Sequence, residues 1–207
     1  MISLPPFVQA LATTALLVSV VVGVLLVVTG RFHNRYSADP FEGAQKLHSE
    51  VTPRVGGLAV YLGVLAAYGV ASALNLRVTQ HLAVLLLAGL PAWLLGMLED
   101  LTKHVRPRWR MLATMTSGVI ASLLSGVSIT HLGVSGLDVL LQVAPISILF
   151  TAFAVAGVTN AVNLIDGMNG LASGFACVAF GALGFIALSE GDYPMVRYCV
   201  VLGASSL

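Results

Sequence analysis

The chain has 207 residues, of which 57% are hydrophobic and only 9% are charged, and its net charge is +1. A soluble domain carries about 25% charged residues, so this composition excludes a water-soluble globule and predicts a chain solvated largely by lipid. The small net charge argues against a nucleic-acid partner. Cys177 and Cys199 lie in apolar stretches without metal-ligand spacing, so we interpret them as small core residues.

Long apolar runs predict an all-α, polytopic transmembrane bundle. A bilayer core about 30 Å thick needs roughly 20 apolar helical residues. Six runs approach this length: 6–30, 55–74, 82–98, 111–129, 139–158 and 171–189. A seventh run, 196–207, is too short to cross at about 1.5 Å per residue, which predicts that the natural chain continues. We expect one integral membrane domain over residues 1–207, with kinks where Pro91 and Pro145 interrupt spans.

Lys and Arg residues are distributed unevenly between alternate loops. The first and third loops hold four each, the second and sixth hold one each, and the fourth and fifth hold none. Cytoplasmic loops carry the excess of positive charge. Loops 31–54, 99–110 and 159–170 are therefore predicted to face the cytoplasm, and the N-terminus to lie outside.

Two adjacent carboxylates, Glu99 and Asp100, end the third span. A helix C-terminus already carries roughly half a negative charge, so these residues need a cation nearby. Lys103 and His104 follow them at the i,i+4 spacing of helical ion pairs, which is a purely structural explanation. The functional explanation is a metal site, because Mg²⁺ is commonly held by one or two carboxylates and substrate phosphates. Taken alone, the pair slightly favours the structural explanation.

A polar helix face closes the fifth span. Asn160, Asn163 and Asp166 are spaced by three, and Gly167 and Gly170 then predict a turn. Asn and Asp can act simply as caps and turn formers. However, three polar residues at membrane depth, with no Lys or Arg in the loop to neutralise Asp166, favour a ligand or metal site.

Basic residues of the first and third loops have two explanations. Lys46, His48 and Arg54 could bind phosphate, and the glycines after Arg54 would let backbone approach a ligand. Positive-inside anchoring with tight helix packing explains them equally well. In the third loop we interpret the arginines as head-group anchors rather than substrate ligands. These are Arg106, Arg108 and Arg110.

Together, the three loops resemble those of polyprenyl-phosphate N-acetylhexosamine-1-phosphate transferases, which are of the glycosyltransferase family 4 type. That family includes the phospho-MurNAc-pentapeptide translocases and the enzymes that start O-antigen, enterobacterial common antigen and teichoic acid synthesis. The order of the motifs and their placement on alternate loops match, and the resemblance covers essentially the whole chain. The similar segments are Lys46-x-His48 with Pro53-Arg-x-Gly-Gly57, Gly96-Met-Leu-Glu-Asp100 and Asn160-x-x-Asn-Leu-Ile-Asp-Gly-Met-Asn-Gly-Leu171.

The chain departs from the family pattern in three ways. Glu99 and Asp100 replace an Asp-Asp pair, and Asn169 replaces the second Asp of an Asp-Gly-x-Asp-Gly segment. Both variants resemble the O-antigen-initiating branch and weaken assignment to the peptidoglycan branch. Family members also continue with further spans, which carry another metal-binding Asp and a His- or Arg-rich substrate loop. We expect a chain that ends at Leu207 to lack a complete metal and sugar site.

The resemblance implies a multi-pass enzyme of the EC 2.7.8 type in the cell inner membrane. It implies transfer of a sugar-1-phosphate from a UDP-sugar to polyprenyl phosphate, expected to be undecaprenyl phosphate, with release of UMP. The implied cofactor is Mg²⁺, with Mn²⁺ as an alternative, and a homodimer is left open. Asp100 and Asp166 would hold the metal and, with Glu99, carry catalysis. The implied substrate ligands are Lys46, His48, Arg54, Asn160, Asn163 and Asn169.

Two other classes of function remain as alternatives to the transferase. A transporter would line a pathway with the polar face of the fifth span, but it predicts polar residues in the middle of spans, whereas here they gather at one membrane face. An inactive fragment or non-catalytic membrane scaffold would bind partners through its spans, and the missing third Asp keeps that alternative open. Mg²⁺-dependent UMP release separates an enzyme from both.

Overall fold

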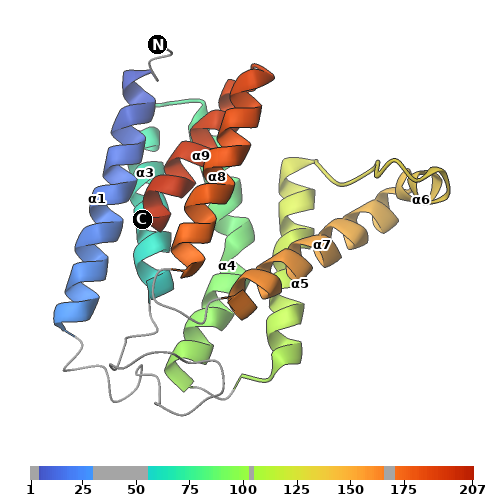
Figure 1. Ribbon diagram of the computed structural model, residues 1–207, viewed down its shortest axis with the longest axis horizontal. Coiled ribbons are helices and arrows are strands. Elements are labelled where there is room, and N and C mark those ends of the chain that lie inside the picture. Colours follow the sequence, from blue (N-terminus) through green and yellow to red (C-terminus); the bar gives the residue numbers. More distant parts are fainter. Residues whose placement is uncertain (1–4, 30–55, 103–104, 166–170) are drawn as a thin grey trace. The chain divides into compact units, whose positions relative to one another are not determined.

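The computed structural model describes residues 5–29, 56–102, 105–165 and 171–207, and every regular element in these residues is a helix (Figure 1). Five helices are long and apolar enough to cross a membrane. This finding confirms the predicted all-α, multi-pass membrane architecture. The five are α1 (Pro6–Val28), α3 (Gly56–Ala73), α4 (Val78–Thr102), α7 (Ala144–Ile165) and α8 (Leu171–Ser189).

The predicted count of six complete spans is not confirmed, because the fourth run forms a less apolar helix. Helix α5 (Pro107–Ser125) has 19 residues but is not among the five candidate spans. Its first turn carries Arg108 and Arg110, which lower its hydropathy. It ends at Gly126, whose φ of 69° is the left-handed conformation that glycine adopts readily at helix ends.

The fifth run is divided between two helices. A short helix, α6 (Ser135–Leu141), precedes α7, so the predicted span 139–158 starts five residues too early. Pro145 is the second residue of α7, where a missing N–H breaks no helical hydrogen bond, and the kink predicted there is wrong. Pro91 does lie inside α4. The N–H of the next residue, Ala92, donates instead to Ser117 Oγ of α5 at 3.2 Å.

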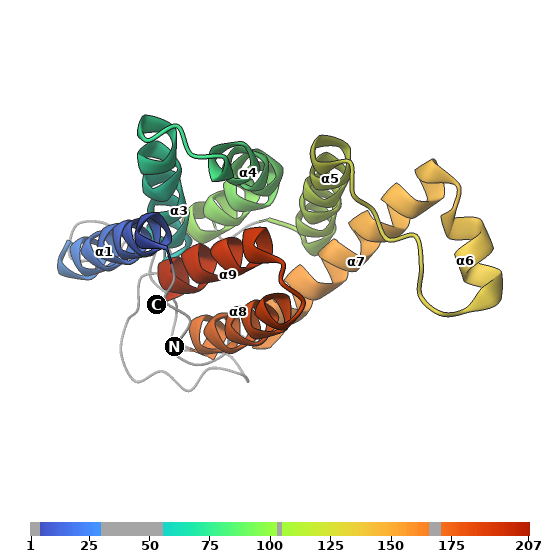
Figure 2. The same cartoon turned by 90° about the horizontal axis from the view of Figure 1, so that it is seen from above.

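The described helices fall into two compact units. The first unit comprises residues 1–82 and 165–207, and in it α9 (Tyr193–Ser206) contacts α1, α3 and α8 (Figures 1 and 2). A Cβ added at Gly63 of α3 would lie 2.8 Å from the carbonyl oxygen of Ala15 in α1. Ser19 Oγ of α1 donates to the carbonyl oxygen of Ser205 in α9 at 2.7 Å. Small residues therefore bring these backbones together, as expected for helices in lipid.

The start of α1, the α3–α4 turn and the α8–α9 turn all lie at one end of the first unit. The Arg197 guanidinium lies over the Phe7 ring, 5.1 Å from its centroid. The rings of His81 and Tyr198 are 5.5 Å apart between centroids. Spans that alternate in direction bring these three connections to one side, as the positive-charge count requires. Which side of the membrane that is, and whether residues 1–207 form one domain, stay predictions.

Candidate functional site

The adjacent carboxylates lie at the C-terminal end of α4, in the second unit, which comprises residues 83–164. Helix α4 continues to Thr102, so Glu99 and Asp100 are both helical, and both are half-buried. Two negative charges in the last turn of a helix oppose its dipole. Their placement therefore depends on positive partners from elsewhere.

Arg110 supplies the positive charge for Glu99. Its guanidinium Nη1 donates to Glu99 Oε1 at 3.0 Å, and the two side chains are 24% and 27% exposed. Arg110 lies in the first turn of α5. The N-terminus of a helix carries a partial positive charge, which makes a cation there unfavourable. Each charge thus offsets the other. The expected partner Lys103 lies outside the described residues.

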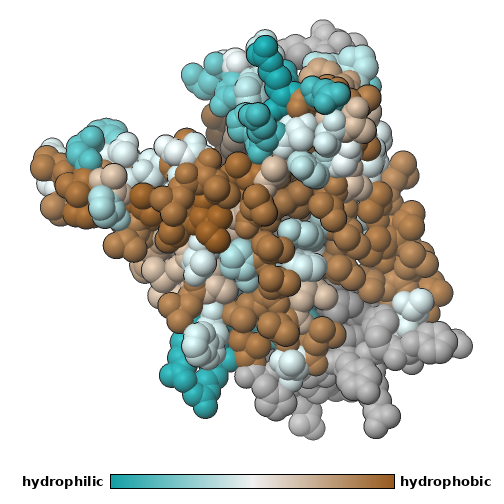
Figure 3. Space-filling view, turned by 180° about the vertical axis from the view of Figure 1, so that it is seen from behind, coloured by the Kyte–Doolittle hydropathy of each residue, from teal (hydrophilic) through white to brown (hydrophobic). Residues whose placement is uncertain are grey.

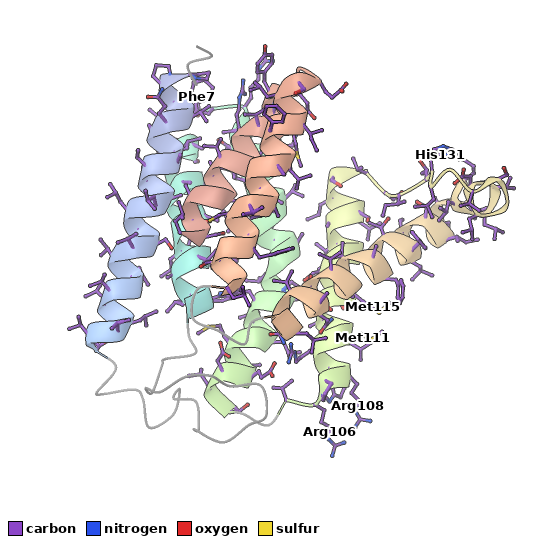
Figure 4. All side chains as sticks on the ribbon, viewed as in Figure 1. Phe7, Arg106, Arg108, Met111, Met115 and His131 are labelled. Carbon is purple, nitrogen blue, oxygen red and sulfur yellow. The ribbon has the colours of Figure 1, made fainter. Side chains whose placement is uncertain are left out.

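The three arginines of this loop behave differently from one another. Arg106 and Arg108 are exposed and point away from the helices at the start of α5 (Figure 4), so their role as head-group anchors stays a prediction. For Arg110 that interpretation is wrong, because its side chain turns back to α4. Glu99 and Arg110 are 11 positions apart and lie in different helices, so the i,i+4 spacing of helical ion pairs does not predict their pairing. The pairing of Arg110 with Glu99 is the contact that the sequence analysis did not predict.

A second link joins α5 to the end of α7. Asn160 is half-buried, and its Nδ2 donates to the carbonyl oxygen of Ala156 at 2.8 Å and to Thr114 Oγ1 at 3.4 Å. The Thr114 hydroxyl is buried and lies 3.0 Å from the carbonyl oxygen of Arg110, to which it donates. The first two turns of α5 therefore bond to Glu99 near the end of α4 and to Asn160 near the end of α7. Asn163 is exposed, one turn after Asn160 on α7.

We call this cluster the polar end of the second unit. The structure brings together two of the three predicted motifs there and places the two asparagines on α7, as their spacing predicted. The polar end comprises Glu99, Asp100, Arg110, Thr114, Asn160 and Asn163. The other predicted site residues, Lys46, His48, Arg54, Asp166 and Asn169, lie outside the described residues.

The polar end offers the carboxylates of Glu99 and Asp100 as possible ligands for Mg²⁺. Within residues 5–29, 56–102, 105–165 and 171–207, no three His, Cys, Asp or Glu side chains lie close enough to hold a metal among themselves. Mg²⁺, however, is usually bound by one or two carboxylates with substrate phosphates and water. A half-buried Asp100 beside an ion-paired Glu99 fits that mode. The polar end is therefore suited to a metal shared with a phosphate ligand.

The Glu99–Arg110 pair predicts a measurable coupling. We expect Glu99→Gln and Arg110→Met each to lower the thermal stability of the protein in detergent, and the double variant to lose less than the sum. Because both side chains are partly exposed, the coupling should be about 0.5–1 kcal/mol. The matched control is Arg108→Met, an exposed arginine of the same turn, which should show no coupling to Glu99. Strictly additive losses would mean that the pair contributes nothing to stability.

The fold and the polar end define an integral membrane protein whose ionic residues gather at helix ends. A model of the family described as glycosyl transferase family 4 matches residues 82–207, more than half of the chain and all of the polar end. The chain belongs to glycosyl transferase family 4.

Curated relatives are similar over most of this chain. The phospho-N-acetylmuramoyl-pentapeptide-transferase of Bacillus cytotoxicus is 29% identical over 164 residues, covering 74% of this chain and 50% of that protein. The decaprenyl-phosphate N-acetylglucosaminephosphotransferase of Mycobacterium leprae is 30% identical over 197 residues, covering 86% and 48%. The undecaprenyl-phosphate alpha-N-acetylglucosaminyl 1-phosphate transferase of Yersinia pestis is 28% identical over 161 residues, covering 78% and 43%. The chain spans about half the length of the curated relatives it matches.

Proposed function

We propose that the protein transfers an N-acetylhexosamine-1-phosphate from a UDP-sugar to polyprenyl phosphate in the membrane. The observation that carries the proposal is that α5 contacts both motifs, Glu99 through Arg110 and Asn160 through Thr114, inside the part that matches the family model. The names of the M. leprae and Y. pestis relatives describe the same class of reaction. Both a polyprenyl phosphate acceptor and a nucleotide donor bring phosphate groups that a polar helix end can bind.

The proposed reaction exchanges one phosphoanhydride bond for another. An oxygen of the polyprenyl phosphate attacks the β-phosphorus of the UDP-sugar, and the bond from that phosphorus to the bridging oxygen breaks. UMP leaves with the bonding electron pair, and the lipid retains a diphosphate linked to the sugar. The attacking oxygen is already anionic near neutral pH, so the protein has mainly to position the two phosphates and to offset their charge.

Each predicted site residue has a role in this proposal. Asp100 would orient the acceptor phosphate or hold the metal, and Glu99, paired with Arg110, would support it from the same turn. Asn160 and Asn163 contact the nucleotide, as do Asp166 and Asn169. Lys46, His48 and Arg54 bind phosphate oxygens. Only the placement of the α4, α5 and α7 residues is part of the described structure.

The metal belongs to the same proposal. Asp100 and Asp166 are the residues that would hold Mg²⁺, with Mn²⁺ as a substitute. When bound, Mg²⁺ supplies neutralisation of the negative charge that gathers on the diphosphate. Glu99, whose carboxylate accepts from Arg110, would support the metal ligands from the same turn.

The finer assignments rest on the sequence motifs. Glu99 in place of Asp and Asn169 in place of Asp favour the O-antigen-initiating branch, with undecaprenyl phosphate as acceptor and the inner membrane as location. The site would then face the cytoplasm, where nucleotide sugars are made. A homodimer is compatible with this proposal and is not required by it.

The test is release of UMP from UDP-GlcNAc by the full-length protein in detergent micelles. We expect release only when the micelles contain polyprenyl phosphate and the buffer contains Mg²⁺. Omission of the lipid separates transfer from simple hydrolysis of the donor. Release that is independent of the lipid would contradict the proposal, as would solute flux through liposomes without any UMP.

A further inference from the structure

The connection between α5 and α7 exposes more apolar surface than a loop in water does. It comprises residues 126–143, contains the short helix α6, and follows the end of α5 that is remote from Arg110. The connection therefore lies at the opposite end of the second unit from the polar end. Its large apolar side chains that are more than two-fifths exposed are Val127, Leu132, Val134, Leu137, Val139, Leu140 and Val143.

Helix α6 has an outward face that is apolar. Val139 is 71% exposed and Leu140 is 52% exposed, whereas Leu141 is buried. At about 100° per residue, Val139 and Leu140 flank Gly136 on one side of the helix, and Asp138 falls on the other. A helix at the surface of a water-soluble protein shows the reverse arrangement, with its polar face outward.

Two polar side chains of the connection, Asp138 and Gln142, bond to groups within it. Asp138 accepts from the backbone N–H of Leu132 at 2.7 Å and pairs with His131 Nδ1 at 2.9 Å. Gln142 Nε2 donates to the carbonyl oxygen of Thr130 at 3.3 Å.

Backbone groups near the start of the connection are also capped by side chains. The N–H of Ile129 donates to Thr151 Oγ1 of α7 at 2.8 Å, and the N–H of Val127 donates to Ser125 Oγ at 3.2 Å. Irregular backbone is tolerated close to hydrocarbon only where its polar groups have partners within the protein. The non-helical part of the connection meets that condition at Val127, Ile129, Thr130 and Leu132.

The apolar face of the connection continues onto a membrane span. Val143 is followed at helical spacing by Ile146, Leu149 and Phe153 of α7, all of them exposed. Helix α7 is one of the five candidate spans. In Figure 3 the connection is at the far left, where brown residues lie beside teal and pale blue ones. Exposed apolar side chains thus occur on both α7 and α6, with the exposed Gln142 between the two helices.

We propose that the connection is a membrane anchor: α6 lies in the interfacial layer of the leaflet opposite to the polar end, with Val139 and Leu140 in the acyl region. With seven residues, α6 is too short to cross the hydrocarbon core. An amphipathic helix in the interface buries its apolar face at the boundary of head groups and acyl chains. His131, which is 76% exposed beside α6 (Figure 4), is placed at the head-group side.

The anchor is tested by labelling single cysteines in liposomes. In a Cys177→Ala, Cys199→Ala background, Val139→Cys and Leu140→Cys are each labelled with an environment-sensitive fluorophore. The matched control is Glu190→Cys, an exposed polar position in the α8–α9 turn. We expect blue-shifted emission at both α6 positions, quenching by lipids that carry a spin label near the head group, and iodide quenching several-fold weaker than at position 190.

Two outcomes would overturn the anchor. Iodide quenching at positions 139 and 140 as strong as at 190 would place α6 in water. Protection from iodide without quenching by spin-labelled lipid would mean that protein covers the face. Adding excess lipid dilutes the protein in the membrane and separates its copies. If protection from iodide fell on such dilution, the covering protein would be a second copy of the chain.

Discussion

Asp100→Asn is expected to lower the rate of UMP release from UDP-GlcNAc by about 10²–10³-fold, the usual cost of removing one group that stabilises charge in a transition state. Asparagine keeps the size of the side chain and its carbonyl oxygen but removes the negative charge. Asp100 is half-buried in the last turn of α4, beside a glutamate that is already paired with Arg110. We expect the loss to appear in the rate of transfer.

The matched control is Asp192→Asn, which makes the same chemical change elsewhere in the chain. Asp192 caps α9 by accepting from the N–H of Met195 at 3.1 Å, and asparagine is an equally good cap. We expect this variant to keep the full rate of UMP release. A fall of similar size in both variants would indicate a general effect of lost charge. Full activity of Asp100→Asn would remove Asp100 from the catalytic machinery.

Gly118→Ala is expected to destabilise the contact between α5 and α7 by about 1–3 kcal/mol, the usual cost of overpacking a close contact. The added Cβ would lie 2.6 Å from the Cα of Ala152, a backbone atom that moves only if the helices separate. Thr114, which bonds Asn160, lies one turn from Gly118 on the same helix. Separation of the helices should therefore lower transfer activity together with thermal stability.

Gly157→Ala is the control for the second variant. Gly157 is also helical, in α7, but a Cβ there meets no atom within 4 Å. Because alanine favours a helix over glycine by about 0.5–1 kcal/mol, this change should leave the melting temperature unchanged or raise it. If Gly118→Ala were as stable as Gly157→Ala in detergent, the close contact of α5 with α7 would be wrong.

Hydrophobic patterning predicted the fold class because lipid imposes a simple requirement on composition and length. It failed at the fifth run because Val139, Leu140 and Leu141 are as apolar as a span and yet belong to α6. Pro145 carried a signal that the kink interpretation missed, since proline is favoured in the first turn of a helix. Local turn chemistry, more than hydropathy, sets where α7 begins.

The sequence predicted that Asn160 and Asn163 share a helix, but not the contacts that α5 makes. The spacing of Asn160 and Asn163 placed both on one helix, and the structure agrees. Arg110 could not be assigned from spacing, because its pairing with Glu99 depends on how two helices meet at their ends. The surplus of negative charge at the end of α4 was the signal that such a partner exists.

The mass of the lipid product tests the central claim most directly. The full-length protein would be incubated with UDP-GlcNAc, polyprenyl phosphate and Mg²⁺, and the extracted lipid analysed by mass spectrometry. Transfer of a sugar-1-phosphate predicts a lipid with two phosphates and one N-acetylhexosamine, formed in equal amount with UMP. A lipid with a single phosphate, accompanied by UDP, would mean that the sugar alone is transferred and would contradict the proposed attack at the β-phosphorus.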